Sequence, residues 1–191
     1  MQEPSDAALV AQAQAELPYR TGAFEALMRR HGARIQQLAR RFAASAADAE
    51  DLTQEVMLKV FFELPRFRAE ATFTTWLWRV TANVCIDHQR RLDSRPALVS
   101  LADDEDTPEP ADPRDPIAAA QARMDMERLL RQLPPEDRMV VLLRLLVGLE
   151  FAEIAKATGL GLSAAKMRYA RALDKLRALA MGADTSHQRS G

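Results

Sequence analysis

The sequence predicts an all-α protein made of two small helical domains joined by a flexible, acidic, proline-rich linker. Of the 191 residues, 48% are hydrophobic, 28% are charged, 6% are aromatic and only 7 are glycine, a balance that favours packed helices over a β-sandwich. Apolar residues recur at spacings of three and four, and no segment alternates with period two. Five of the ten prolines fall between residues 95 and 116, which divides the chain in two.

Segment 95–116 is the predicted linker. Besides its five prolines it holds seven acidic residues and two arginines, for a net charge of -5. Proline removes backbone donors and like charges repel one another, so this segment is expected to be extended. Its role stays open between a plain spacer and an acidic strand that threads a basic channel on a larger partner. The domains then cover residues 1–94 and 117–182, followed by a disordered tail, 183–191.

Eight helices are predicted. Four precede the linker, near residues 5–17, 23–44, 45–64 and 74–91, and the third opens at Ser45 with Asp48 three residues on, which is close to a capping box. On helix 45–64, apolar residues recur every four positions and form one row along the helix: Leu52, Val56, Val60 and Leu64. Four more follow the linker, at 118–132, 135–147, 151–158 and 162–180, with Pro135 suited to a first helical turn.

Several functional classes are excluded by what the sequence lacks. The single cysteine, Cys85, allows no disulfide framework or cysteine-based zinc site, and the three histidines share no metal-ligand spacing. We therefore expect no cofactor, no metal and no enzyme activity. There is no secretory signal, and the longest apolar stretch, 139–149, is interrupted by Arg144 and too short to span a membrane. These features predict a soluble, cytoplasmic protein of a reducing compartment.

The segment FAEIAKATGLGLSAAKMRYARALDKLR predicts a DNA-binding helix-turn-helix. Ala155 is small where two helices approach closely, and Gly159 lies where a tight turn needs positive φ. Residues 163–179 carry a net charge of +4, as expected of a helix that faces phosphates and base edges. The alternative is a basic surface helix that only keeps the domain soluble. The candidate DNA-binding residues are Ser163, Lys166, Arg168, Arg171 and Lys175.

Two surfaces are predicted in the first domain. On helix 45–64, four polar residues and one leucine share one face, which is either plainly solvated or a docking site: Asp48, Asp51, Gln54, Glu55 and Leu58. The next helix opens with aromatics and continues with an amide and arginines, which suits single-stranded nucleic acid because bases stack on rings while cations hold phosphates. The alternative for Trp76 and Trp78 is that both are simply core. The candidate residues are Phe67, Phe73, Trp76, Arg79, Asn83, Asp87, Arg90 and Arg91.

Three strings in order, DAEDLTQEVMLKVF (48–61), FRAEATFTTWLWRVTANVCIDHQRR (67–91) and LPPEDRMVVLLRLLVGLEFAEIAKATG (133–159), give the chain a resemblance to bacterial extracytoplasmic-function (ECF) sigma factors of the sigma-70 family. The likeness covers roughly residues 5–180. It implies sigma regions 2 and 4 on a linker. Many relatives have T-V-K-S-R where this chain has residues 164–168, AAKMR, so the preferred -35 sequence does not transfer.

By that resemblance, the face from Asp48 to Leu58 would bind the β′ clamp helices of core RNA polymerase. The aromatic and basic residues from Phe67 to Arg91 would bind the -10 element, and loop 67–73 would hold a flipped base. The basic helix would read the -35 element, and its domain would also dock on the β flap. An anti-sigma factor, often membrane-anchored, is implied as an inhibitor; the chain itself would not insert into the membrane.

The leading hypothesis is a sigma factor that starts transcription of a stress-response regulon. The net charge of -1 argues against a DNA binder that acts alone, but polymerase can supply most of the nonspecific grip. A stand-alone helix-turn-helix regulator is the alternative, and it would bind promoter duplex without polymerase.

Overall fold

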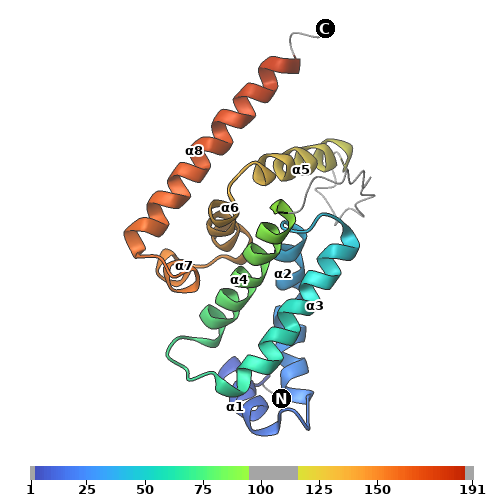
Figure 1. Ribbon diagram of the computed structural model, residues 1–191, viewed down its shortest axis with the longest axis vertical. Helices are drawn as coiled ribbons and strands as arrows, with labels where there is room; N and C mark the ends of the chain where they lie inside the picture. Colours follow the sequence, from blue (N-terminus) through green and yellow to red (C-terminus); the bar gives the residue numbers. More distant parts are fainter. Residues whose placement is uncertain (1–2, 95–115, 188–191) are drawn as a thin grey trace.

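The computed structural model describes residues 3–94 and 116–187, with side chains for 3–94 and 124–181 (Figure 1). Within these ranges the regular structure is helical and no strand occurs. The all-α prediction is therefore confirmed, whereas the predicted linker, 95–116, lies outside the described residues except for Pro116, which begins a helix. None of the described helices is long and apolar enough to cross a membrane.

The first domain packs helices α1 (Asp6–Glu16), α2 (Gly22–Arg40), α3 (Ala46–Glu63) and α4 (Phe73–Asp93) around one core, with a 3-10 turn at Leu64–Arg66. The predicted row of α3, from Leu52 to Leu64, is at most 1% exposed. Helix α2 ends four residues earlier than predicted because the chain tightens there. The Phe42 N–H donates to the Ala39 carbonyl, which turns the Phe42 ring into the core at 1% exposure.

The start of α3 nearly forms the predicted capping box. The Ser45 hydroxyl accepts a hydrogen bond from the Asp48 N–H at 3.1 Å. The Asp48 carboxylate, however, accepts from the Ala44 N–H at 2.7 Å rather than from Ser45. Both bonds satisfy backbone donors that a helix end leaves open, so the helix begins at a defined residue.

The second domain contains α5 (Pro116–Arg131), α6 (Pro135–Leu142), a π-helical turn at Leu143–Val147, α7 (Phe151–Thr158) and α8 (Leu162–His187). Gly148 and Gly159 end helical segments with φ of 84° and 70°. At the start of α7, Glu150 and Glu153 form a capping box that was not predicted. Helix α8 runs to His187, past the start of the tail predicted at 183, since the segment is alanine-rich and has no proline.

The two domains pack against each other, although the sequence left their arrangement open. Helix α7 lies against α4, and α6 also contacts α4 (Figure 1). The helix-turn-helix therefore lies beside the last helix of the first domain, and α8 projects away from it.

Gly159→Ala should destabilise the helix-turn-helix by about 1–2 kcal/mol, because an L-residue is disfavoured at φ 70°. A Cβ at this site would meet no atom within 4 Å, so the loss comes from the backbone alone. Gly22→Ala is the matched control: it also places a Cβ in open space, but at the start of α2, and should be neutral or slightly stabilising. Urea denaturation of both variants measures the difference, and equal stabilities would contradict the assignment of the turn.

Candidate functional site

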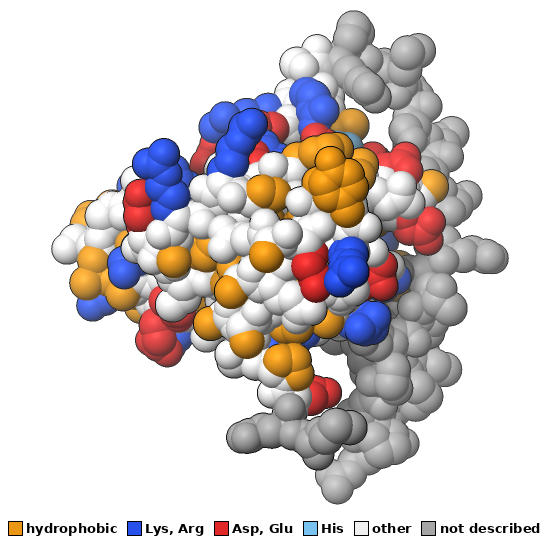
Figure 2. Space-filling model, turned by 90° about the horizontal axis from the view of Figure 1, so that it is seen from below, with side chains coloured by type: hydrophobic (Ala, Val, Ile, Leu, Met, Phe, Trp, Pro, Cys, Tyr) orange, Lys and Arg blue, Asp and Glu red, His pale blue; other side chains and the backbone are white. Residues whose placement is uncertain are grey.

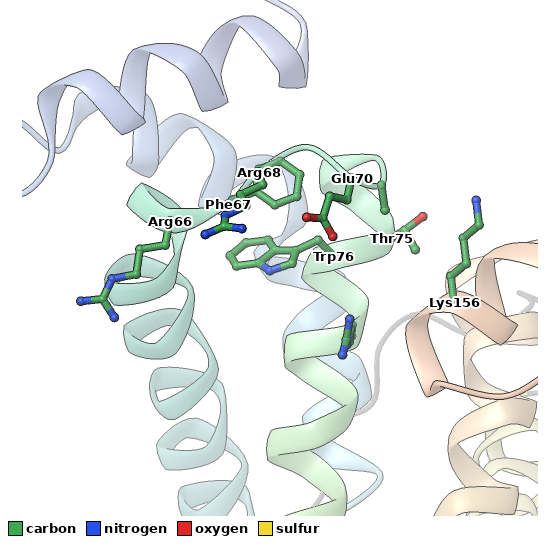
Figure 3. A pocket seen from close by; sticks show the side chains of 9 residues that line it. Arg66, Phe67, Arg68, Glu70, Thr75, Trp76 and Lys156 are labelled. Carbon is green, nitrogen blue, oxygen red and sulfur yellow. The ribbon is translucent and has the colours of Figure 1, made fainter.

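A cavity of about 450 Å³ opens where the loop after α3 meets the start of α4. A second hollow of about 330 Å³ shares two of its aromatic side chains, Phe67 and Trp76. In Figure 3 the indole of Trp76 on α4 faces the loop that carries Phe67 and Arg68, while Lys156 approaches from α7. We call this cavity the α4 pocket; its lining residues are Arg66, Phe67, Arg68, Glu70, Ala71, Thr75, Trp76, Arg79 and Lys156.

Three aromatic rings form the floor of the α4 pocket. The Trp76 ring centroid lies 5.1 Å from that of Phe67 and 5.8 Å from that of Phe73. Phe73 is only 6% exposed, so it supports the other two rings from beneath, whereas Trp76 and Phe67 are half-buried and reachable. The Thr72 hydroxyl caps α4 by accepting from the Thr75 N–H at 3.2 Å, and this cap sets where Trp76 emerges. Such an arrangement can stack flat, apolar rings such as nucleobases.

The charges around the floor are unbalanced. Arg66, Arg68, Arg79 and Lys156 line the pocket against one carboxylate, Glu70. None of these five side chains has an ion-pair partner among the described residues. Figure 2 shows basic, acidic and hydrophobic side chains intermixed over the lower end of the molecule, in keeping with the net charge of -1. Attraction for an anion therefore comes from this local cluster rather than from the whole protein.

The basic and amide residues predicted along α4 fall into two groups, those without an ion-pair partner among the described residues and those held in ion pairs. Arg79 and Asn83 are exposed, and no described side chain pairs with Arg79. Arg90 lies 2.7 Å from Glu136 of α6 and 3.7 Å from Asp87. Arg91 turns toward α3, where it lies 3.1 Å from Glu55. The structure therefore brings Phe67, Trp76 and Arg79 together in the pocket and leaves Arg90 and Arg91 in other contacts.

The two tryptophans have different environments. Trp78 is 1% exposed and belongs to the core, as the alternative interpretation held. Trp76 is one of the pocket residues. Because helical positions two apart point in different directions, one residue can face the core while the other faces the loop.

The exposed side of α3 carries carboxylates at one end and apolar side chains at the other. Asp51, Gln54 and Glu55 are exposed, and Leu58 is 58% exposed. Asp48 is instead held within the domain, since its carboxylate lies 3.0 Å from the His88 Nε2 and also accepts from a backbone N–H. Phe62, one turn past Leu58, is 69% exposed and was missed, although its spacing of four continues the face. The α3 face is defined here as Asp51, Gln54, Glu55, Leu58 and Phe62.

Helix α8 presents most of its predicted cations to solvent. Its core side is marked by Ala165 and Ala172, which are buried, whereas four predicted residues outside that side are exposed: Ser163, Lys166, Arg171 and Lys175. Arg168 is different, because its guanidinium lies 3.1 Å from Asp137 of α6. Arg168 thus ties α8 to α6 within the domain.

Comparison with known proteins matches both domains. The family Sigma-70 region 2 matches residues 27–95, and Sigma-70, region 4 matches residues 123–176. The RNA polymerase sigma factor CarQ of Myxococcus xanthus is 34% identical over 160 residues, which cover 82% of this chain and 88% of CarQ. The ECF RNA polymerase sigma factor SigE of Mycolicibacterium smegmatis is also 34% identical, and there the match spans 60% of the relative's length.

Solved structures agree with these matches. CnrH, in complex with the cytosolic domain of CnrY, superposes with a TM-score of 0.70 and 28% identity over 93% of this chain and 97% of CnrH. The sigma factor RpoE, in complex with the anti-sigma factor NepR from Bartonella quintana, shares the fold with a TM-score of 0.64 at 19% identity, over 83% of this chain and 96% of RpoE. The ECF RNA polymerase sigma factor SigM of Mycobacterium tuberculosis is 34% identical over 91% of this chain and 84% of its own length. With regions 2 and 4 both matched, the chain belongs to the ECF sigma factors of the sigma-70 family.

Proposed function

We propose that this chain binds core RNA polymerase, recognises the -10 and -35 promoter elements and initiates transcription of a stress-response regulon. The observation that carries the proposal is the α4 pocket, in which an aromatic floor is surrounded by cations without ion-pair partners among the described residues. A protein that reads only duplex DNA has no need of such a pocket, because bases are stacked inside a duplex.

In region 2, the α4 pocket takes the separated strand of the -10 element. A base stacks on Trp76 and Phe67, while Arg66, Arg68 and Arg79 hold neighbouring phosphates and Asn83 donates hydrogen bonds further along α4. Stacking a base on an aromatic ring contributes about 1–3 kcal/mol, against about 1.4 kcal/mol for each stacked step of duplex that is lost. Two half-buried but reachable rings with phosphate contacts can therefore offset the opening of a few base pairs. Phe73 acts from beneath, as the support of both rings.

In region 4, α8 enters the major groove of the -35 element with its exposed side. Ser163, Lys166, Arg171 and Lys175 make the phosphate and base contacts. Arg168 positions α8 through Asp137, and a direct DNA contact would require that this ion pair break.

The α3 face binds the β′ clamp helices, and region 4 docks on the β flap. Mixed apolar and charged surfaces with an exposed aromatic residue are typical of protein interfaces, and Leu58 and Phe62 supply the apolar centre. The carboxylates of Asp51 and Glu55 then lie at the polar rim.

An anti-sigma factor inhibits the chain by covering these faces. Support comes from the two solved relatives, CnrH and RpoE, each of which is held by a protein partner, named for RpoE as an anti-sigma factor. The partner of CnrH in that structure is a cytosolic domain, and we propose by analogy a membrane-anchored inhibitor that meets this chain in the cytoplasm.

A run-off transcription assay with and without core polymerase tests the proposed function. Transcripts should require both the chain and the core enzyme. Specific footprinting of promoter duplex by the free chain at nanomolar concentration, without transcription, would instead identify a stand-alone regulator.

Trp76→Ala should weaken binding of a single-stranded -10 oligonucleotide to the holoenzyme by about 1–3 kcal/mol and change stability much less than Trp78→Ala. Trp78→Ala empties a core site and should lower the free energy of unfolding by about 3–5 kcal/mol. Oligonucleotide titration and urea denaturation of both variants separate the two roles. Equal oligonucleotide affinity for Trp76→Ala and the unchanged protein would rule out the stacking floor.

Arg79→Ala combined with Asn83→Ala should leave binding to core polymerase unchanged but reduce promoter opening about ten- to a hundred-fold, because a phosphate contact and an amide contact to the open strand are lost. Permanganate reactivity at the start site measures opening. Arg29→Ala, on the exposed side of α2, is the control and should open promoters normally. Unchanged permanganate reactivity in the double variant would reject the assignment.

Leu58→Arg should lower affinity for core polymerase at least about tenfold, since it buries a charge at the apolar centre of the α3 face. Tyr19→Arg is the matched control, because Tyr19 is 93% exposed and lies outside that face. Fluorescence anisotropy of labelled protein titrated with core enzyme gives both affinities. A loss of equal size in both variants would show that added charge, rather than the site, is responsible.

A further inference from the structure

We propose that region 4 is itself a docking partner of region 2, and that the free sigma factor closes through a specific interdomain clasp that must open before both promoter elements are bound. Only the last step rests on the proposed function. The clasp joins Arg41, Gln89 and Arg90 of region 2 to Glu127, Glu136 and Arg138 of region 4.

Arg138 is the centre of the clasp. Its side chain is 4% exposed, and its Nη1 donates to the Arg41 carbonyl at 2.9 Å and to the Gln89 Oε1 at 3.2 Å. Its guanidinium also lies 5.1 Å from the ring centroid of Phe42. The Nη2 donates to two carbonyls of its own domain, those of Arg131 and Leu133. A buried cation needs such partners, and here region 2 supplies part of them.

Two ion pairs flank Arg138. Arg90 of α4 lies 2.7 Å from Glu136, and Arg41 pairs with Glu127 of α5. Burial acts to raise the pKa of Glu136, but the hydrogen bond from Arg90 and the charges of Arg90 and Arg168 bring that pKa below its ordinary value. Ion pairs near the surface contribute little stability on their own. We assign these two pairs the role of selecting the register in which α7 packs on α4, and the buried Arg138 contacts the role of stabilising that packing.

The closed form places the helix-turn-helix of region 4 beside the α4 pocket of region 2. Helix α7 packs against α4 (Figure 1), and its Lys156 lines the α4 pocket (Figure 3). On DNA, elements centred at -10 and -35 are about 25 base pairs apart, or about 85 Å at about 3.4 Å per base pair. Helices in contact cannot span that distance, and Arg90 cannot serve Glu136 and a phosphate at once. Binding both elements therefore requires that the clasp open.

The comparison with CnrH is consistent with a closed form. That likeness extends over both domains, since it covers 93% of this chain with a TM-score of 0.70, and CnrH was solved with a partner bound. An arrangement of this kind in the free chain would offer an inhibitor a preformed surface.

Distance measurement by pulsed electron paramagnetic resonance on the full chain tests the clasp. Ala11→Cys on α1 and Ala178→Cys on α8 are exposed positions for nitroxide labels. The native Cys85 is fully buried, and burial raises the pKa of its thiol, so the label spares it. The labelled chain should give one narrow distance distribution. Glu127→Arg with Glu136→Arg should shift it to longer, broader distances, with at least about a fivefold rise in the open population.

A charge swap makes the test specific. Arg90→Glu combined with Glu136→Arg should return the distribution to narrow, because the pair re-forms with reversed signs. Asp174→Arg is the control for charge reversal itself: like Glu136→Arg, it replaces one carboxylate with a guanidinium, but on α8 outside the clasp, and it should leave the distance unchanged. A broad distribution in the unchanged chain, or no response to Glu127→Arg with Glu136→Arg, would overturn the clasp.

The same labels separate the clasp from the proposed function. The first measurements contain neither DNA nor polymerase, so they stand even if run-off transcription fails. Adding core polymerase and promoter DNA should move the labels apart. A distribution that stays narrow and short in an active initiation complex would overturn the claim that the clasp must open.

Discussion

The burial of one face of α4 is the constraint on which region 2 depends. Leu77 and Trp78 are at most 1% exposed, and Val84 is 2% exposed, so the rotation of α4 about its axis is fixed by packing. The Thr72 cap fixes where the helix begins. Together, the packing of α4 and its cap orient Trp76 toward the loop and Arg79 toward solvent. The position of the pocket is therefore a consequence of how the core is packed.

The remaining surface of α4 contacts both α3 and region 4. His88 contacts the Asp48 carboxylate and Arg91 contacts Glu55, so α3 and α4 are tied together beside the proposed polymerase face. Arg90 and Gln89 contact region 4. Open DNA and region 4 would therefore both contact α4, while polymerase would bind the α3 face beside it. A chain with a net charge of -1 can still bind DNA because the cations around the α4 pocket act at short range, while salt screens the more distant charges.

Signals within a few residues predicted the positions of the helices well. The side-chain contacts between residues far apart in the sequence could not be predicted in this way. The row from Leu52 to Leu64 and helix α7 were predictable, because the apolar periodicity of α3 and the turn glycine Gly159 after α7 are signals that lie within a few residues. That Asp48 contacts a histidine 40 positions away, or that Arg168 pairs with Asp137, has no local signature. Trp76 and Trp78 were not separable for the same reason, since which one faces the core depends on how α4 packs. The domain arrangement was open because the linker imposes no geometry.

If the chain has a closed and an open form, its partners shift the equilibrium between these forms in opposite directions. A ligand shifts such an equilibrium only through its differential affinity for the two forms. Polymerase with promoter DNA favours the open form, because both elements must be reached. An inhibitor that binds the closed form better favours release from polymerase without contacting every polymerase-binding residue. Because only the open form can reach both elements, each kcal/mol that stabilises a predominantly closed form weakens promoter engagement by the same amount. The strength of the Arg138 contacts would then determine how readily the free sigma factor is bound by an inhibitor or engages polymerase and promoter DNA.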